Sequence, residues 1–569
     1  MFKGHPKGLF ILSLANMGER FGYYTMLAIF VLFIQAKFGF TSNQTSDIFG
    51  IFLAAVYFLP LFGGIIADKW LGYGKTIIIG IAIMFTGYFL LAIPSGTDTM
   101  AKLAMFGSLT LIALGTGLFK GNVQALMGNL YDDPRYSDKR DLAFSIFYMC
   151  INIGAFFAPS AATAVTNFFL SQDGLVYEAK IPALAHQLIN GQINTDGISQ
   201  LQSLAAAQGH VITNMESLQE FANSYITKLS GAYNWGFGVA CLSLIVSMTI
   251  FLAFRKSYKA ADVTAAQQAK AEKANPAESH TVELTKSQVK ERITALCLVF
   301  AVVIFFWMSF HQNGLTMTFF ARDYTDKIIT GANRLWFSLP AMIFIIVAFY
   351  GILNLVQSKD KKGKAVAGLV AAAGIACTAL FYHFVIGSDS IKIGPEIFQQ
   401  FNPFFIIIMT PVIVSIFTKL AAKGKEPSAP RKIGIGMFVA AVGFTILILG
   451  SLNLPAPSSL VNTGGVSETL VSSNWLIGTY FTLTIAELFL SPMGLSFVSR
   501  VAPPQYKGLM QGGWLAATAI GNYLVAIIGK LWSHLELWQL WAVLVVCCLI
   551  SALFIFAIMK RLERVTKNA

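Results

Sequence analysis

Charged residues are scarce in this chain of 569 residues. They make up 12% of it, against about a quarter in ordinary soluble domains. Hydrophobic residues make up 55% and gather in many runs of about 20 residues, the length needed to cross a bilayer as a helix. These observations exclude an ordinary soluble protein and predict one that spans a membrane many times. The first run is too long for a cleavable signal peptide, and no small-residue cleavage site follows it, so we expect a spanning helix there.

Motifs for metal binding and catalysis are absent from the sequence. The six cysteines all fall inside apolar segments and lack metal-ligand spacing, so we interpret them as packing residues. The sequence contains no H-E-x-x-H, no G-x-S-x-G and no glycine-rich loop that would cradle a phosphate. We therefore expect no enzyme activity, no metal site and no organic cofactor.

The net charge of +13 does not indicate a nucleic-acid partner, because the lysines and arginines lie in short loops between apolar runs. Positive loops tend to stay on the cytoplasmic side of a membrane. Segment 171–231 has five acids and two lysines, and segment 454–474 has neither Lys nor Arg, so both are expected outside. The pattern predicts a cell-membrane protein with both termini in the cytoplasm and an even number of spans.

We expect about fourteen spanning helices. They are predicted near 8–36, 45–68, 74–94, 102–130, 142–169, 232–254, 293–320, 334–356, 365–387, 398–421, 433–452, 473–498, 507–530 and 536–559. Together they predict an all-α membrane protein.

A polar, Lys-, Ala- and Glu-rich linker at 255–292 divides the chain into two halves. Residues 1–254 are expected to form a six-helix bundle, and residues 293–569 a second one with an extra helix pair at 334–387. That pair is low in ionisable residues, so we interpret it as a peripheral hairpin. The outer segment 171–231 has helical spacing of apolar residues, which predicts short surface helices. Two bundles around a cytoplasmic linker are typical of transporters that bind their substrate near the membrane midplane between the halves.

Ionisable residues inside the predicted spans point to the functional site, because such residues are costly in a bilayer. Glu19 and Arg20 lie in the first span, within "NMGERFGYYTM", and Tyr23 shares their helix face. Lys120 lies in "GTGLFKGN" of the first half, and Glu487 in "TIAELFL" of the second. An arginine and a lysine in one half and a glutamate in the other suit a ligand with a carboxylate and an amine, such as a free peptide. A buried structural ion pair is the alternative for Glu19 and Arg20.

Several motifs in the same order resemble the proton-dependent oligopeptide transporters, the POT or PTR family of the major facilitator superfamily. They are "ERFGYY", "GGIIADKWLGYGKT", "GTGLFKGN", "FSIFYMCINIGAFFAP", "FFWMSFHQNG", "FQQFNPFFIIIMTP" and the stretch that begins "ELFLSPMGLSF". The resemblance implies the major facilitator fold, with twelve core helices plus the inserted pair. It also implies import of di- and tripeptides with protons by alternating access. We expect the protein to function as a monomer.

The resemblance implies a substrate site drawn from both halves. Its residues would be Arg20, Tyr23, Tyr57, Lys120, Asn152, Trp307, Asn402, Glu487 and Trp514. Arg20 and Lys120 would bind the peptide carboxylate, and Lys120 would pair with Glu19 when the site is empty or the proton is bound elsewhere. Glu487 would bind the amine with help from the two asparagines, and the larger aromatic residues would line side-chain pockets. Packing is the alternative role for each aromatic residue.

The chain departs from the family pattern at several positions, and two of the departures remove acids that the family uses in proton coupling. Asn16 stands where the family has a glutamate, Leu27 where it has an arginine, and His311 where an acid commonly precedes the glutamine. Glu19 and His311 are therefore the expected proton-coupling residues. A facilitator without coupling, a carrier of another anion or of drugs, and a non-transporting sensor stay open as alternatives.

Overall fold

The computed structural model describes residues 4–264, 267, 285–387, 389–503 and 506–567. Thirteen helical segments within these ranges are long and apolar enough to span a membrane. The remaining predicted helix is α18, which has 28 residues and includes side chains outside the description. The prediction of an all-α membrane protein is confirmed.

The first half contains six spanning segments and two short helices. These are α1 (Lys7–Phe38), α2 (Ser42–Phe58) continued by α3 (Pro60–Ile66) and a π-helical turn (Ala67–Leu71), α4 (Tyr73–Ala92), α5 (Thr99–Asn129), α6 (Arg140–Gln172), α7 (Lys180–Ile189), α8 (Thr195–Ala207) and α9 (Met215–Ala253). Helix α1 packs against α6 and α9, and α4 packs against α5.

The second half contains the remaining spans and one short β-ribbon. Its elements are α11 (Lys286–Phe310), a 3₁₀ turn (His311–Gly314), α12 (Thr316–Asp323), β1 (Ile328–Ile329), α13 (Arg334–Phe337), α14 (Leu339–Gln357), α15 (Lys361–Phe381), β2 (Ile391–Lys392), a 3₁₀ turn (Pro395–Gln400), α16 (Phe401–Ala422), α17 (Ala429–Ser451), a 3₁₀ turn (Pro457–Thr463), α18 (Asn474–Val501), α19 (Lys507–Leu531), α20 (Leu537–Ala557) and α21 (Met559–Lys567). The antiparallel strands β1 and β2 pair across the base of the α14–α15 hairpin.

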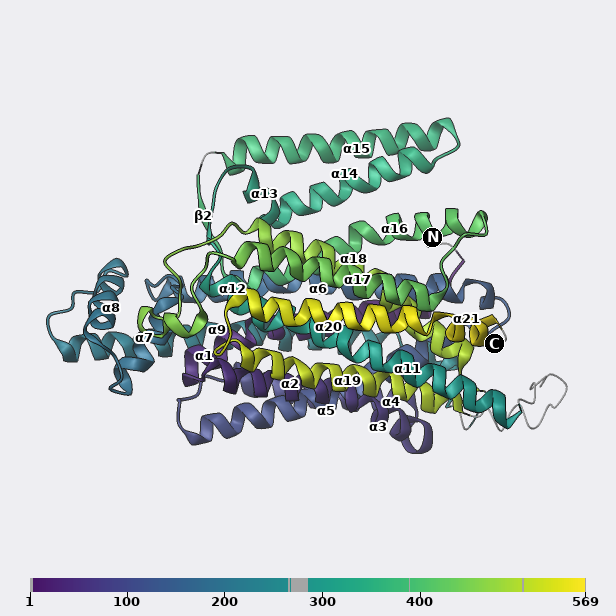
Figure 1. Ribbon diagram of the computed structural model, residues 1–569, viewed down its shortest axis with the longest axis horizontal. Coiled ribbons are helices and arrows are strands. Elements are labelled where there is room, and N and C mark those ends of the chain that lie inside the picture. Colours follow the sequence, from purple (N-terminus) through teal and green to yellow (C-terminus); the bar gives the residue numbers. More distant parts are fainter. Residues whose placement is uncertain (1–3, 265–266, 268–284, 388, 504–505, 568–569) are drawn as a thin grey trace.

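The spanning helices of both halves run along the long axis of the molecule (Figure 1). Helix α2 packs against α19, and α6 packs against α16, so each half contributes two helices to these contacts. Both termini lie at one end, and α7 and α8 lie at the opposite end, which we call the outer end. This arrangement agrees with the even number of spans that the loop charges predict.

Local sequence signals explain where the first helices begin and end. Gly39 ends α1 in the left-handed conformation, with φ of 65°, and its N–H donates to the Gln35 carbonyl at 3.0 Å. Thr41 then caps α2 through a reciprocal capping box with Gln44. Inside the bundle, a Cβ on Gly115 would lie 2.6 Å from the Gly80 carbonyl oxygen. Helices α4 and α5 therefore approach closely because both positions are glycine.

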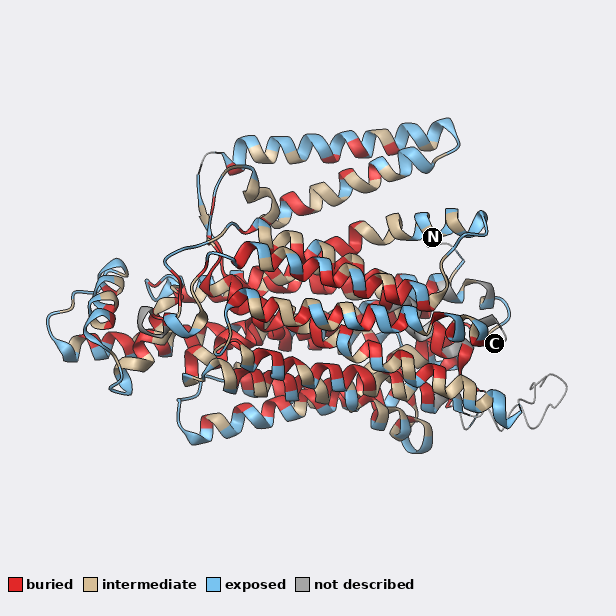
Figure 2. Ribbon diagram, viewed as in Figure 1, coloured by how far each residue is buried: buried red, intermediate tan, exposed pale blue. Residues whose placement is uncertain are grey.

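Burial separates the core bundles from the α14–α15 hairpin (Figure 2). In the most apolar stretch of α1, 72% of the residues are buried, against 17% in α14 and in α15. The hairpin therefore lies at the edge of the second half, with most of its surface facing outward.

The outer segment differs from the expectation in one respect. Residues 171–231 contain the short helices α7 and α8, but α9 begins at Met215 rather than near residue 232. Asn214 caps this helix by accepting from the Ser217 N–H at 2.8 Å. The first turns of α9 are polar, and hydropathy detects only apolar stretches. The sequence therefore predicts only the apolar part of this helix.

Candidate functional site

The first pair of charges forms an ion pair within α1. Arg20 donates from Nε to Glu19 Oε2 at 2.5 Å and from Nη2 to Glu19 Oε1 at 2.6 Å. The side chains are 5% and 0% exposed. The Arg20 guanidinium also lies 4.8 Å from the centre of the Tyr23 ring. Two adjacent residues thus bury opposite charges together, which lowers the cost of keeping either one inside the bundle.

Lys120 does not pair with Glu19, so that expectation is wrong for this conformation. Its Nζ lies 3.4 Å from the centre of the Tyr57 ring, and none of its described contacts is an ion pair. Both carboxylate oxygens of Glu19 already accept hydrogen bonds from the Arg20 guanidinium. A lysine ammonium cannot form this bidentate pair. The aromatic ring of Tyr57 accepts the lysine cation instead.

Glu487 lies at the meeting point of three helices. Its Oε2 accepts a hydrogen bond from Asn402 Nδ2 of α16 at 2.9 Å, and its Oε1 accepts one from the Tyr148 hydroxyl of α6 at 3.2 Å. The residue is 7% exposed. Among the described residues, its hydrogen-bond donors are neutral, and no cation lies within ion-pair distance. The carboxylate therefore retains the capacity to bind a cationic group.

Sequence reasoning missed Tyr148 and placed Asn152 too close to the carboxylate. Asn152 Nδ2 donates to the Tyr148 carbonyl at 2.9 Å, within its own helix, and supports the tyrosine. Tyr148 precedes Asn152 by four residues, so both share one helix face. That spacing was the available signal, and the phenol is the group that crosses from the first half to Glu487.

Aromatic rings connect Lys120 to the second half. The rings of Tyr57 and His311 lie 5.7 Å apart, and His311 stacks on Trp307 at 5.0 Å. The structure thus brings together four of the predicted residues across the interface between the halves. Trp514 is instead 5% exposed and packs edge-on against Phe300 of α11. This environment agrees with a packing role for Trp514, the alternative to lining a substrate pocket.

Several buried polar atoms of the interface have no hydrogen-bond partner among the described residues. They include Trp307 Nε1 and His311 Nδ1. Buried polar groups are nearly always hydrogen-bonded in folded proteins. Unpaired donors and acceptors beside Lys120 and Tyr57 are therefore the feature expected where water or a polar ligand binds.

The two halves are joined by hydrogen bonds toward the outer end. Ser160 of α6 donates to Gln400 at 2.6 Å, and Thr163 of α6 donates to Glu396 at 2.8 Å. Arg322 of α12 reaches Gln35 of α1. These contacts close the outer side of the interface.

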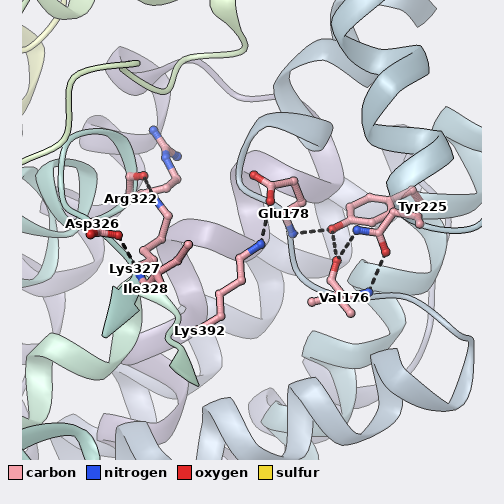
Figure 3. A network of polar contacts seen from close by, with 9 residues as sticks. Val176, Glu178, Tyr225, Arg322, Asp326, Lys327, Ile328 and Lys392 are labelled. Atoms are coloured by element: carbon pink, nitrogen blue, oxygen red, sulfur yellow. Dashed lines mark hydrogen bonds and ion pairs between the residues drawn. The ribbon is translucent and has the colours of Figure 1, made fainter. Parts of the chain in front are cut away.

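The outer segment adds an ion pair between the halves (Figure 3). Lys392 of β2 donates to Glu178 at 2.7 Å, and the Tyr225 hydroxyl of α9 accepts from the Glu178 N–H at 2.8 Å. The neighbouring Lys327 donates to the Arg322 carbonyl, and burial lowers its pKa to about 8. We refer to the Glu178–Lys392 pair as the outer clasp, since it links a loop of the first half to the β-ribbon of the second.

A two-bundle membrane fold with opposite charges in its two halves defines a secondary transporter. The sequence profile of the POT family matches residues 74–177 and 378–538. The chain is 28% identical to the peptide transporter YePEPT of Yersinia enterocolitica, over 93% of this chain and 88% of that one. It is 26% identical to dipeptide and tripeptide permease B of Xenorhabdus bovienii, over 92% and 87% of the two chains. The chain is therefore similar to POT family transporters in both of its halves.

Solved structures confirm the predicted two-bundle major facilitator fold. A crystal structure of the peptide transporter POT in complex with sulfate matches with a TM-score of 0.64 and 23% identity, over 99% of this chain and 96% of that one. A POT family transporter in complex with 5-aminolevulinic acid matches with a TM-score of 0.66 and 19% identity, over 99% and 98%. The family consists of transporters, so the expectation that the chain is not an enzyme is confirmed.

Proposed function

We propose that this protein imports di- and tripeptides together with protons by alternating access. The observation that carries the proposal is the charge pattern of the site. Arg20 and Lys120 belong to the first half, and Glu487 belongs to the second. A free peptide has a carboxylate and an ammonium group at its two ends, so a peptide bound in one orientation satisfies both halves at once.

The amine end of the peptide would bind Glu487. This carboxylate is oriented by Asn402 and Tyr148, and both are neutral donors that leave its charge uncompensated. The names of the curated relatives, which include a peptide transporter and a dipeptide and tripeptide permease, support a peptide as the substrate.

The carboxylate end of the peptide would bind Lys120 and Arg20. The contact with Arg20 would provide a route to proton coupling. Glu19 holds the Arg20 fork in the present conformation. A substrate carboxylate competes with Glu19 for the same donors, and protonation of Glu19 removes its negative charge and releases them. Proton binding and peptide binding would thus favour each other. His311, stacked between Tyr57 and Trp307, is the second proton-coupling residue in this proposal.

Alternating access would open the outer end of the interface and close the other. The outer clasp and the hydrogen bonds of α6 to Glu396 and Gln400 would break in that step. Since the loop charges follow the positive-inside pattern, the protein would lie in the cell membrane with both termini in the cytoplasm. We propose a functional monomer that uses protons as its coupling ion and needs no bound cofactor.

Uptake of labelled dialanine into proteoliposomes tests the proposal, with an inward proton gradient and without one. Stimulation by the gradient, lost in Glu19→Gln and in Glu487→Gln, is the expected result. Gradient-independent equilibration would identify a facilitator, binding without uptake would identify a sensor, and absence of binding would point to another solute.

A further inference from the structure

The α14–α15 hairpin has a cavity that is open to its surface and that the transport site does not use. It has a volume of about 410 Å³ and lies on the side of the hairpin turn. Its lining includes Asn354 and Ser358 from the end of α14 and its flank, and Lys362, Val366 and Val370 from α15. The hairpin turn lies at the same end of the molecule as both chain termini (Figure 1).

Close helix packing sets the inner limit of this cavity. A Cβ on Gly351 would lie 2.4 Å from the Ala371 backbone nitrogen, and one on Gly374 would lie 2.5 Å from the Ala348 nitrogen. The two helices therefore touch through small residues in their middle. The lining residues continue from this contact toward the turn.

The chemistry of the lining changes along α15. Lys362 stands at the turn, and Val370 follows eight residues later, about 12 Å along the helix axis. Ser358 shares the lysine end, because a Cβ on the neighbouring Gly363 would lie 3.0 Å from its Oγ, while Val366 and Val370 form the apolar end. A cavity with a cationic, hydrogen-bonding end and an apolar end fits an amphiphile with an acidic head.

The turn carries an excess of positive charge. Lys359, Lys361, Lys362 and Lys364 surround a single acid, Asp360, whose carboxylate caps α15 by accepting from the Gly363 N–H at 2.7 Å. In the described part of the chain, none of these lysines forms an ion pair. Groups of four or more basic residues next to a spanning helix attract anionic lipid.

The surroundings determine which amphiphile can reach the cavity. The hairpin faces outward along most of its length, with Val366 61% and Leu369 72% exposed. In a membrane these side chains contact lipid. We propose that the cavity binds one anionic phospholipid, with its phosphate against Lys362 and Ser358 and an acyl chain along the two valines.

This site is independent of the transported solute, so its test does not depend on uptake. The purified full-length protein is titrated with phosphatidylglycerol, with phosphatidylcholine as the zwitterionic control, and bound lipids are counted by native mass spectrometry. The expected result is one preferred phosphatidylglycerol. Lys362→Gln should weaken its binding about fivefold, the change expected from one lysine near an anionic lipid.

Two further variants separate a cavity from general surface charge. Val366→Trp fills the apolar end without changing charge, and Val370→Phe is the smaller alternative if the first variant does not fold. Either should weaken phosphatidylglycerol binding. The matched control replaces Lys423 and Lys425, exposed lysines of the α16–α17 loop, by glutamine and should leave binding unchanged.

Three outcomes would overturn the proposal. If the control loop and Lys362 contribute equally, the lipid is attracted by diffuse charge. If filling the apolar end has no effect, no acyl chain lies there. If millimolar inorganic phosphate displaces phosphatidylglycerol completely, the lysine end is an anion site and the ligand is not a lipid.

Discussion

Glu487→Gln should remove the recognition of the peptide amine while leaving the fold intact. Glutamine has the same shape and can still accept a hydrogen bond from Asn402 Nδ2, which lies 2.9 Å from the carboxylate. What is lost is the negative charge of a side chain that is only 7% exposed. A hydrogen bond to a charged group contributes about 1.5–3 kcal/mol. We therefore expect dialanine to bind about 10- to 150-fold more weakly.

The measurement is a binding titration of dialanine and of N-acetyl-dialanine against both proteins. In the parent protein, acetylation should weaken binding, because it removes the ammonium group that we propose Glu487 binds. In Glu487→Gln, acetylation should make little further difference. Glu468→Gln, at an exposed acid of the same half, serves as the matched control and should behave like the parent. An equal penalty for acetylation in parent and variant would refute the assignment of Glu487 to the amine.

Three further predictions concern stability and the outer end. Glu19→Ala leaves its arginine partner buried without a counter-charge, so it should lower the unfolding free energy by about 3–5 kcal/mol. The measurement is the melting temperature in detergent. The control is Glu291→Ala, at an exposed ion pair, and an equally small change in both variants would contradict the prediction. Burial lowers the pKa of His186 below its ordinary 6.5, so the unfolded chain binds the proton more tightly and stability should fall as the pH drops below about 6.5. His186→Gln, which can still donate to the Ala36 carbonyl, should flatten this acid-side loss of melting temperature, and an unchanged pH profile would exclude the histidine as its source. Charge reversal of Glu178 to lysine should increase the distance between spin labels placed on the two sides of the outer clasp. The added reversal of Lys392 to glutamate should restore the original distance. The exposed pair contributes at most about 1 kcal/mol, and no change of distance in either variant would mean that the clasp does not hold the outer end.

The sequence predicts helices and helix faces well, because both follow from local periodicity and hydropathy. The spans of α1 and α20 follow the apolar runs to within a few residues. The charges of the site were likewise visible, since an ionisable residue inside an apolar run stands out wherever it packs. Tyr148 carried a weaker signal, because a tyrosine in a spanning helix is common and only its spacing from Asn152 marks it.

Partners across the interface could not be predicted, because they depend on how distant helices pack. Lys392 and Glu178 are 214 positions apart, and neither residue is unusual in its own segment. Lys120 shows the same limit. Either Arg20 or Lys120 could pair with the Glu19 carboxylate. The structure pairs it with Arg20, because the adjacent guanidinium can donate two hydrogen bonds to it.

The two charged ends of the site differ in a way that bears on coupling. The positive end is partly neutralised, because Glu19 occupies Arg20, whereas Glu487 meets only neutral donors among the described residues. In the proposed function, a peptide amine would therefore meet an uncompensated carboxylate, but a peptide carboxylate would compete with the Glu19 carboxylate. With Asn16 in place of the family's glutamate, Glu19 is the acid of this motif that can compete. In the proposed function, proton binding at Glu19 would thus act on the carboxylate end of the substrate, and Glu19 would link the proton to the peptide there.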